Sequence, residues 1–151
     1  MAIFHHAVYA FASGEDRADL MQEILLAVWK AATSFRGDAQ PTTFLYRVSH
    51  NTAMSWRRKR INDQRSVEQA QTNFSEAHSP NSRQEQVEQL YAMIRALPLL
   101  DRSLLLLSLD EVSYREMAEI HGINENLVGV RLLRARTKLM EQMKEQNNEA
   151  R

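Results

Sequence analysis

Two clusters of basic side chains are the groups in this sequence best suited to bind a ligand. Residues 57–65 hold five bases against a single acid, and these bases are Arg57, Arg58, Lys59, Arg60 and Arg65. From residue 128 onward, three glutamates stand against Arg131, Arg134, Arg136, Lys138, Lys144 and Arg151. Residues 66–127 between the clusters carry ten acids and four bases. Clustered guanidinium and ammonium groups bind phosphates, and because charges act over about 8 to 10 Å, the net charge of zero does not exclude this.

Catalytic and metal-binding patterns are missing from the sequence. We find no pair of acids, no Ser/His/Asp set and no glycine-rich loop that would cradle a phosphate. His5 and His6 are adjacent, so in a helix their side chains point about 100° apart and chelate a single metal ion poorly. The chain has no cysteine, which removes disulfides and thiolate metal sites. We therefore expect no enzyme, no cofactor and no metal ion.

The composition indicates a helical globular protein. Its 151 residues suffice for one ordinary domain or two small ones, and four Gly and three Pro stand against 44% hydrophobic residues. The apolar runs, such as residues 104–107, are far shorter than the roughly 20 residues that a membrane span needs. The start of the chain shows no secretion signal. We expect a cytoplasmic protein without a membrane span.

Helical periodicity predicts an all-α fold of two small domains joined by a flexible linker. Residues 1–61 form the first domain, with a short first helix over residues 2–12, a second that Asp16 can cap, and a third from Pro41. Residues 62–86 are rich in Gln, Ser, Asn and Glu and read as the linker. Helices resume at Val87 and, after a cap at Asp101, continue through the second domain, residues 87–145. Residues 146–151 are a polar tail.

Residues 113–139 have the layout of a helix-turn-helix. Ser113 and Glu116 match a capping box, Gly122 falls where a helix would end, and Asn124 can cap the next helix. In this motif the second helix enters the major groove, where Arg131, Arg134 and Arg136 would reach phosphates. An ordinary helical hairpin with a solvated basic face is the alternative.

The break at residues 34–40 precedes the other basic cluster. Glycine interrupts the helical pattern there, Phe35 sits at its edge, and the next helix runs into Trp56 and the basic run 57–60. A basic helix end also stabilises the negative end of the helix dipole, so this run can be purely structural.

Two long stretches resemble the extracytoplasmic-function (ECF) group of bacterial RNA polymerase sigma factors. "DRADLMQEILLAVWKAATSFRGDAQPTTFLYRVSHNTAMSWRRKR" resembles their second conserved region, and "IRALPLLDRSLLLLSLDEVSYREMAEIHGINENLVGVRLLRARTKL" is similar to their fourth. The stretches stand in the family's order with a linker between them. The resemblance implies a protein that binds core RNA polymerase through its β′ clamp and β subunits, recognises the -10 and -35 promoter elements and promotes melting. An anti-sigma factor is a further candidate partner.

The resemblance also implies roles for individual residues. On the second helix, Asp19, Gln22 and Glu23 match the polymerase contact. Ala31, Phe35 and Asn51 would form a pocket for a flipped base of the -10 element. Its phosphates would be held by Arg47, Arg57, Arg58 and Arg60. The -35 element would meet the last helix at Asn126, Gly129, Val130, Arg131, Leu133, Arg134 and Arg136. Any one of these side chains can instead be solvated or part of the core.

Three features depart from the family's pattern. Gly129 replaces a long polar or basic residue, and glycine inside a helix costs about 1 kcal/mol relative to alanine. Leu127 stands where threonine is common. The chain also begins late, with a short first helix.

Two other functions are compatible with the residues alone. A helix-turn-helix regulator would bind duplex DNA without polymerase, and a helical adaptor would use its arginines to bind an acidic protein.

Overall fold

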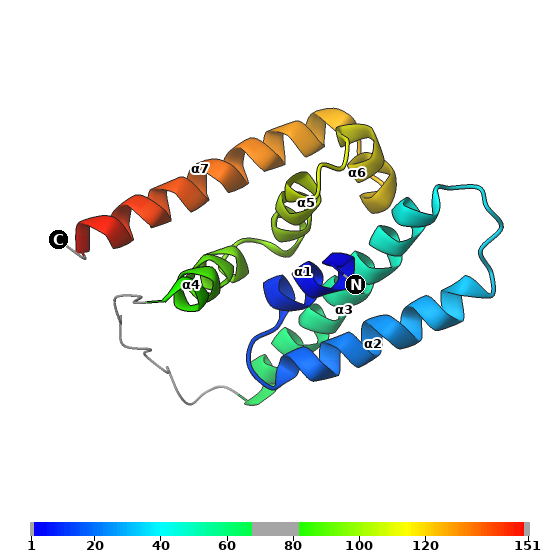
Figure 1. Ribbon diagram of the computed structural model, residues 1–151, viewed down its shortest axis with the longest axis horizontal. Helices are drawn as coiled ribbons and strands as arrows, with labels where there is room; N and C mark the ends of the chain where they lie inside the picture. Colours follow the sequence, from blue (N-terminus) through cyan, green and yellow to red (C-terminus); the bar gives the residue numbers. More distant parts are fainter. Residues whose placement is uncertain (1, 68–81, 150–151) are drawn as a thin grey trace.

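The computed structural model describes residues 2–67 and 82–149, which form seven α-helices and no strand (Figure 1). They are α1 (Ala2–Phe11), α2 (Asp16–Ala32), α3 (Pro41–Val67), α4 (Arg83–Arg95), α5 (Leu99–Leu109), α6 (Tyr114–His121) and α7 (Glu125–Glu149). The predicted all-α fold is confirmed. Within these residues, no helix has the length and apolar character that a membrane crossing requires.

Short-range signals fix the helix ends around α6. The Ser113 hydroxyl accepts a hydrogen bond from the Glu116 N–H at 3.2 Å, and the Glu116 carboxylate accepts one from the Ser113 N–H at 3.1 Å. Gly122 ends α6 in the left-handed conformation, with φ of 64°, which a residue with a Cβ adopts only at a cost. Asn124 accepts a bond from the first turn of α7 at 2.8 Å. The predicted capping box, end and cap are therefore confirmed.

The expected linker is helical at both of its margins. α3 begins at Pro41, as predicted, but it continues past the basic run to Val67. α4 begins at Arg83, four residues before Val87, because Ser82 caps it with a complete capping box. Residues 68–81 of the expected linker lie outside the described residues.

Two predicted caps are wrong. Asp16 and Asp101 both lie inside the first turn of their helices, and neither makes a cap bond. Each carboxylate pairs with an arginine of another helix instead, Asp16 with Arg60 and Asp101 with Arg131, both at 2.8 Å. A long-range ion pair has thus replaced the local bond that the sequence suggested.

The N-terminal and C-terminal helices pack against each other. α1, α2 and α3 form one group, and α5, α6 and α7 form another (Figure 1). α1 lies between α3 and α4 and also touches α5, while α3 contacts α5 and α6. We call this packing of α1 and α3 on α4, α5 and α6 the closed arrangement.

Two apolar clusters hold the helices together. The first crosses the closed arrangement, because it joins Phe11 of α1, Ile24 of α2, Met54 of α3, Ile94 of α4 and Leu105 of α5. The second joins α5, α6 and α7 through Leu104, Leu107, Met117, Ile120, Val128 and Leu132. Burial of each such side chain contributes about 1.5 to 3 kcal/mol. The two halves therefore share a core while the C-terminal half also has one of its own.

Polar contacts across the closed arrangement are less uniform. Glu88 of α4 accepts hydrogen bonds from Arg17 of α2 at 2.7 and 2.9 Å and from Arg95 at 2.7 Å. Burial tends to raise the pKa of Glu88, but the two arginines outweigh it and lower this pKa.

Arg102 is buried over the ring of Phe11 with one guanidinium nitrogen unpartnered. Such a group costs about 1 to 3 kcal/mol, so it opposes closure.

Candidate nucleic-acid interface

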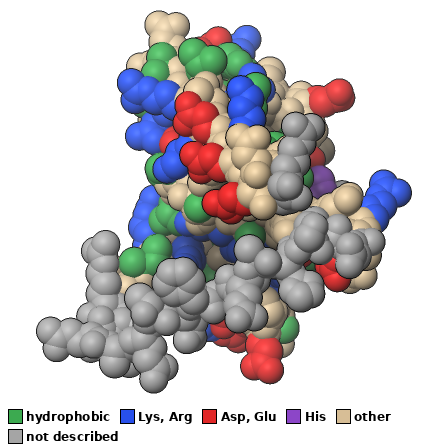
Figure 2. Space-filling view, turned by 90° about the vertical axis from the view of Figure 1, so that its left-hand side faces the viewer, with side chains coloured by type: hydrophobic (Ala, Val, Ile, Leu, Met, Phe, Trp, Pro, Cys, Tyr) green, Lys and Arg blue, Asp and Glu red, His purple; other side chains and the backbone are tan. Residues whose placement is uncertain are grey.

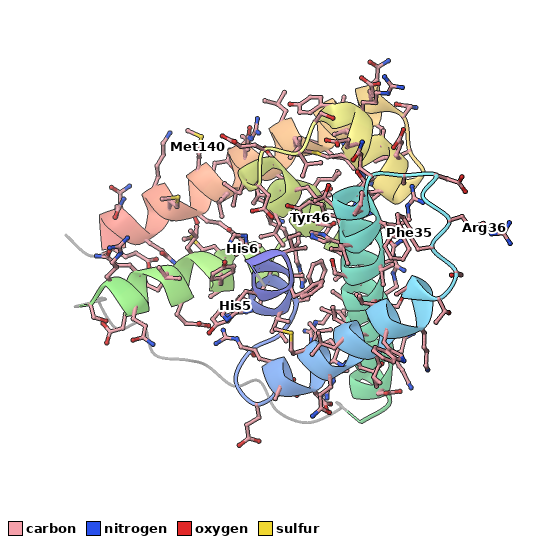
Figure 3. All side chains as sticks on the ribbon, turned by 45° about the vertical axis from the view of Figure 1, so that its right-hand side comes forward. His5, His6, Phe35, Arg36, Tyr46 and Met140 are labelled. Carbon is pink, nitrogen blue, oxygen red and sulfur yellow. The ribbon has the colours of Figure 1, made fainter. Side chains whose placement is uncertain are left out.

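The loop between α2 and α3 lies opposite α6. Gly37 takes a left-handed conformation there, with φ of 80°. Phe35 packs its ring 4.7 Å from that of Phe44 and keeps 38% of its surface exposed, while Arg36 points away from the body of the protein (Figure 3). The loop and α6 together line a cleft of about 920 Å³, with Thr43 on one side and Glu119 on the other. The C-terminal half therefore contributes one wall of the space beside the loop that carries Phe35.

Asn51 lies in a different place from Phe35. It is exposed on α3 and lines a second cleft of about 430 Å³ with Glu23, Trp56 and Lys59. Ala31, near the end of α2, lines neither cleft. The structure thus does not gather the three predicted pocket residues around one cavity.

Two of the predicted phosphate-binding arginines on α3 have intramolecular partners. Arg47 donates a hydrogen bond to the backbone carbonyl of Glu119 in α6 at 3.3 Å. Arg60 lies over the ring of Trp56, 4.5 Å from its centroid, and pairs with Asp16 and Asp19. Arg57 and Arg58 make no hydrogen bond or ion pair with any described residue. The basic run is therefore divided between bound and available side chains.

The predicted polymerase contacts lie on the outer side of α2. Asp19, Gln22 and Glu23 are all exposed, whereas Leu20 and Ile24 are buried. Asp19 pairs with Arg60 at 2.7 Å. This ion pair connects the residues predicted to bind polymerase with those predicted to bind the -10 element.

The predicted -35 positions divide between two sides of α7. Because successive helical residues are about 100° apart, Asn126, Val130, Leu133 and Arg134 lie opposite the buried Val128 and Leu132, and all four are exposed. Arg131 and Arg136 lie on the flanks instead. Arg131 donates to Asp101 at 2.8 Å, and Arg136 to the Ser108 hydroxyl at 2.5 Å.

Gly129 lies beside this exposed face. A Cβ added to it would meet the ring of Tyr114 at 3.5 Å, which is an ordinary contact distance. Its φ is not in the left-handed range. The backbone therefore does not require glycine at this position.

Local charge is segregated even though the net charge is zero. In the upper part of Figure 2, Lys and Arg side chains gather toward one edge, and Asp and Glu side chains lie beside them nearer the middle. In the described part of the chain, no group of three His, Asp or Glu side chains is placed to hold a metal ion.

A cluster of polar side chains between the halves was not predicted from the sequence. It includes Tyr46 and His50 of α3, Ser103 of α5 and His121 of α6. Burial, followed by the charge of Asp110, raises the pKa of Tyr46 to about 12. The available signal was the position of His50, four residues after Tyr46 and four before Met54 on one side of a helix.

Comparison with known proteins identifies both halves. The family model "Sigma-70 region 2" matches residues 2–61, and "Sigma-70, region 4" matches residues 87–139. The RNA polymerase sigma factor YlaC of Bacillus subtilis (strain 168) is 30% identical over 143 residues, which cover 91% of this chain and 83% of YlaC. The ECF RNA polymerase sigma-E factor of Escherichia coli (strain K12) is 31% identical over 134 residues, covering 80% of this chain and 70% of that protein.

Solved structures show the same fold. The sigma factor RpoE in complex with the anti-sigma factor NepR from Bartonella quintana superposes with a TM-score of 0.74, at 23% identity, over 95% of this chain and 90% of that one. CnrH in complex with the cytosolic domain of CnrY gives a TM-score of 0.64 at 21% identity, over 95% and 82% of the two chains.

The chain belongs to the sigma-70 family of RNA polymerase sigma factors, in its ECF group. It is a transcription initiation factor that acts with core RNA polymerase at promoter DNA. The predicted family and function are confirmed. The relatives are RNA polymerase sigma factors, which does not support the alternative of a regulator that binds DNA without polymerase.

Proposed function

We propose that the two halves divide promoter recognition between them. The outer face of α7, with Asn126, Val130, Leu133 and Arg134, contacts the -35 element, and Arg131 and Arg136 join the phosphate contacts once released from α5. The loop 34–40 and α3 bind the -10 element. The observation that carries the proposal is the outer face of α7, whose matched side chains are exposed while the opposite side of the same helix is buried.

In this proposal, residues 1–61 and 87–145 are the working domains, residues 62–86 join them, and residues 146–151 form a tail. Neither domain contributes a catalytic residue, and the protein works in the cytoplasm. Its contribution to melting is binding energy, because an extruded base costs a few kcal/mol that a pocket must offset.

Polymerase binding by α2 is tested with a charge-reversal pair. Asp19→Lys with Glu23→Lys should abolish binding to core polymerase, measured by co-elution. Because Asp19 also pairs with Arg60, the control is Glu15→Lys with Asp16→Lys, which makes the same charge change and also breaks an Arg60 ion pair. Equal losses in both double variants would contradict the assignment.

The -10 pocket is tested on Asn51. Asn51→Ala should spare core binding but reduce open-complex formation, detected by permanganate reactivity of unpaired thymines. Ser55→Ala, one turn later on the same exposed side of α3 and in the same cleft, is the control and should melt promoters normally. Normal melting by Asn51→Ala would remove Asn51 from the pocket.

An anti-sigma factor is part of the proposal because the similar RpoE is described in complex with one. A candidate anti-sigma protein added before core polymerase should lower transcript yield in proportion to its amount. Yield that stays constant in stoichiometric excess would reject that candidate.

A further inference from the structure

A histidine–serine–histidine bridge joins three helices of the closed arrangement. The Ser103 hydroxyl of α5 lies 2.6 Å from Nδ1 of His50 in α3 and 2.7 Å from Nε2 of His121 in α6. The two imidazole rings meet edge to face with centroids 6.5 Å apart. His50 keeps 1% of its surface exposed and Ser103 none. The bridge exists only while α3 lies against α5 and α6.

Neutral imidazoles satisfy this bridge. A serine hydroxyl donates one hydrogen bond and accepts others, so it donates to one ring and accepts the N–H of the other. An added proton places a full charge on a ring whose partner is a neutral hydroxyl. Among the described residues, no carboxylate hydrogen-bonds either ring. Burial of such a charge without an ionic partner is unfavourable.

Other charged groups surround the bridge. From α1, His6 contacts Asp110 at 3.1 Å, and from α3 the Tyr46 hydroxyl donates to Asp110 at 3.2 Å. Arg47 of α3 reaches the backbone of α6, where Glu116 and Glu119 lie. Across α5, Asp101 is already paired with Arg131 of α7. The contact between His6 and Asp110 crosses the closed arrangement, so it opposes release.

We propose that the His50–Ser103–His121 bridge is a proton-sensitive latch, which holds the two halves of the protein closed while both imidazoles are neutral and releases them when these rings take up protons.

The direction of the effect follows from the two pKa values. Burial, followed by the charges of His121 and His6, lowers the pKa of His50 from 6.5 to about 3, and burial lowers that of His121 from 6.5 to about 4. In an open chain both rings return toward 6.5. The open form therefore binds protons more tightly than the closed form does. The latch holds fully above about pH 6.5 and weakens as the pH falls below this value. When the pH falls from 7.5 to 5.5, each ring raises the equilibrium constant for opening about tenfold, and the two rings together raise it about a hundredfold.

Opening has a consequence for promoter binding, and this step rests on the proposed function. Release of α3 from α6 breaks the bond between Arg47 and Glu119 and removes the α6 wall of the cleft beside Phe35. Acid would therefore favour the form whose -10 surface is accessible. The latch itself requires neither polymerase nor DNA, so it is tested separately.

Fluorescence energy transfer on the full chain tests the latch. The chain has no cysteine, so Ala18→Cys on α2 and Lys138→Cys on α7, both exposed positions, take a dye pair cleanly. Transfer efficiency should fall between pH 7.5 and 5.5 while helical circular dichroism is retained. Constant efficiency over this range, or a fall that accompanies loss of helix, would overturn the proposal.

Glutamine variants show which groups titrate. Glutamine can hydrogen-bond Ser103 but takes up no proton. In His50→Gln and in His121→Gln, the opening equilibrium constant should therefore change only about tenfold between pH 7.5 and 5.5. In the double variant it should change hardly at all. His5→Gln is the control, because His5 is exposed and stacks on Tyr9 away from the bridge, and it should respond as the unmodified protein does. A full response in the double variant would overturn the latch.

Ser103→Ala keeps the test decisive if the double variant fails to fold. This change removes only the bridging hydroxyl, so efficiency should already be lower at pH 7.5 with helicity unchanged. Efficiency equal to that of the unmodified protein at pH 7.5 would show that the bridge does not hold the halves together.

Discussion

The side chains of α7 that are proposed to meet the -35 element point away from the helical body. By contrast, α3 and the loop 34–40 are proposed to meet the -10 element, and they face another part of the same chain. Val130 and Leu133 are exposed by 46% and 68%, while Thr43 at the start of α3 is exposed by only 4%. Arg134 makes no hydrogen bond or ion pair with a described residue, whereas Arg47 is bonded to α6. In the closed arrangement one of the two proposed DNA surfaces is therefore available and the other is partly covered.

This difference shows that the two surfaces need different events before they bind DNA. The α7 face requires no rearrangement of the fold to accept a duplex. On α3, Arg47 must leave α6 before it can bind a phosphate, whereas Asn51 and Arg58 are already exposed. A free sigma factor in the closed arrangement would thus engage -35 DNA more readily than a -10 strand.

The two sides of α7 provide the largest expected effect. Leu132 is fully buried and Leu133 is its exposed neighbour. Leu132→Ala should lower the free energy of unfolding by about 2 to 5 kcal/mol, because it leaves a cavity in the second apolar cluster. Leu133→Ala should change it by less than about 0.5 kcal/mol yet weaken binding to -35 duplex. Urea denaturation measures both changes in stability, and equal losses of stability in the two variants would mean that the α7 face is not open.

Two arginines on α7 sharpen the same comparison. Arg134→Ala should weaken binding of the holoenzyme to promoter duplex about fivefold to tenfold and reduce the slope of log K against log salt by about 1, because one phosphate contact is lost. Arg136→Ala should weaken it less, since Arg136 must first leave Ser108. Fluorescence anisotropy at several salt concentrations measures these effects. A larger loss from Arg136→Ala would reverse the proposed division of the helix.

Glu88 tests the covering of the α3 face from the opposite end of the molecule. Glu88→Gln should favour opening by up to about 1 kcal/mol, the scale of a partly exposed ion pair, because it loosens Arg17 of α2 from α4. The pKa of Glu88 is lowered from 4.5, so its contribution to closure is present above about pH 4.5 and is lost at lower pH. Energy transfer between the labelled halves measures this, with the exposed Glu141→Gln as the neutral control.

Substitutions of two glycines should have effects of opposite sign. Gly129→Ala should stabilise the protein by about 0.5 to 1 kcal/mol, because it removes glycine from a helix interior where a Cβ has room. Gly122→Ala should destabilise it by about 1 to 2 kcal/mol, because its φ of 64° disfavours a side chain. Thermal unfolding distinguishes the two signs, and a loss of stability in Gly129→Ala would mean that α7 packs more tightly against Tyr114 than the structure indicates.

Helix ends were predictable where their bonds are local. Each of the bonds made by Ser113, Glu116, Gly122 and Asn124 joins residues three or four positions apart, so their spacing carries the information. Asp16 and Asp101 had the right types for caps, but arginines far along the chain bind them instead. Nearby backbone groups and distant arginines compete for the same carboxylate, and only the fold determines which of them it binds.

The candidate site was predictable in kind but not in arrangement. The family resemblance placed Leu133 and Arg134 among the -35 positions, and helical spacing puts Arg134 opposite Leu132. It could not place Arg47 on α6 or His50 against Ser103, because these contacts join segments more than 50 residues apart. Such contacts depend on how the halves dock, and no periodicity in either half encodes that docking.

Thiol accessibility in the free protein tests most directly whether one DNA surface is covered and the other open. Single cysteines at Thr43→Cys and Val130→Cys would be modified with a water-soluble maleimide, before and after addition of core polymerase. Thr43→Cys should react at least about tenfold more slowly than Val130→Cys in the free chain, because Thr43 is 4% exposed and Val130 46%, and it should speed up when polymerase binds. Equal rates in the free chain would contradict the closed arrangement and the covered -10 surface.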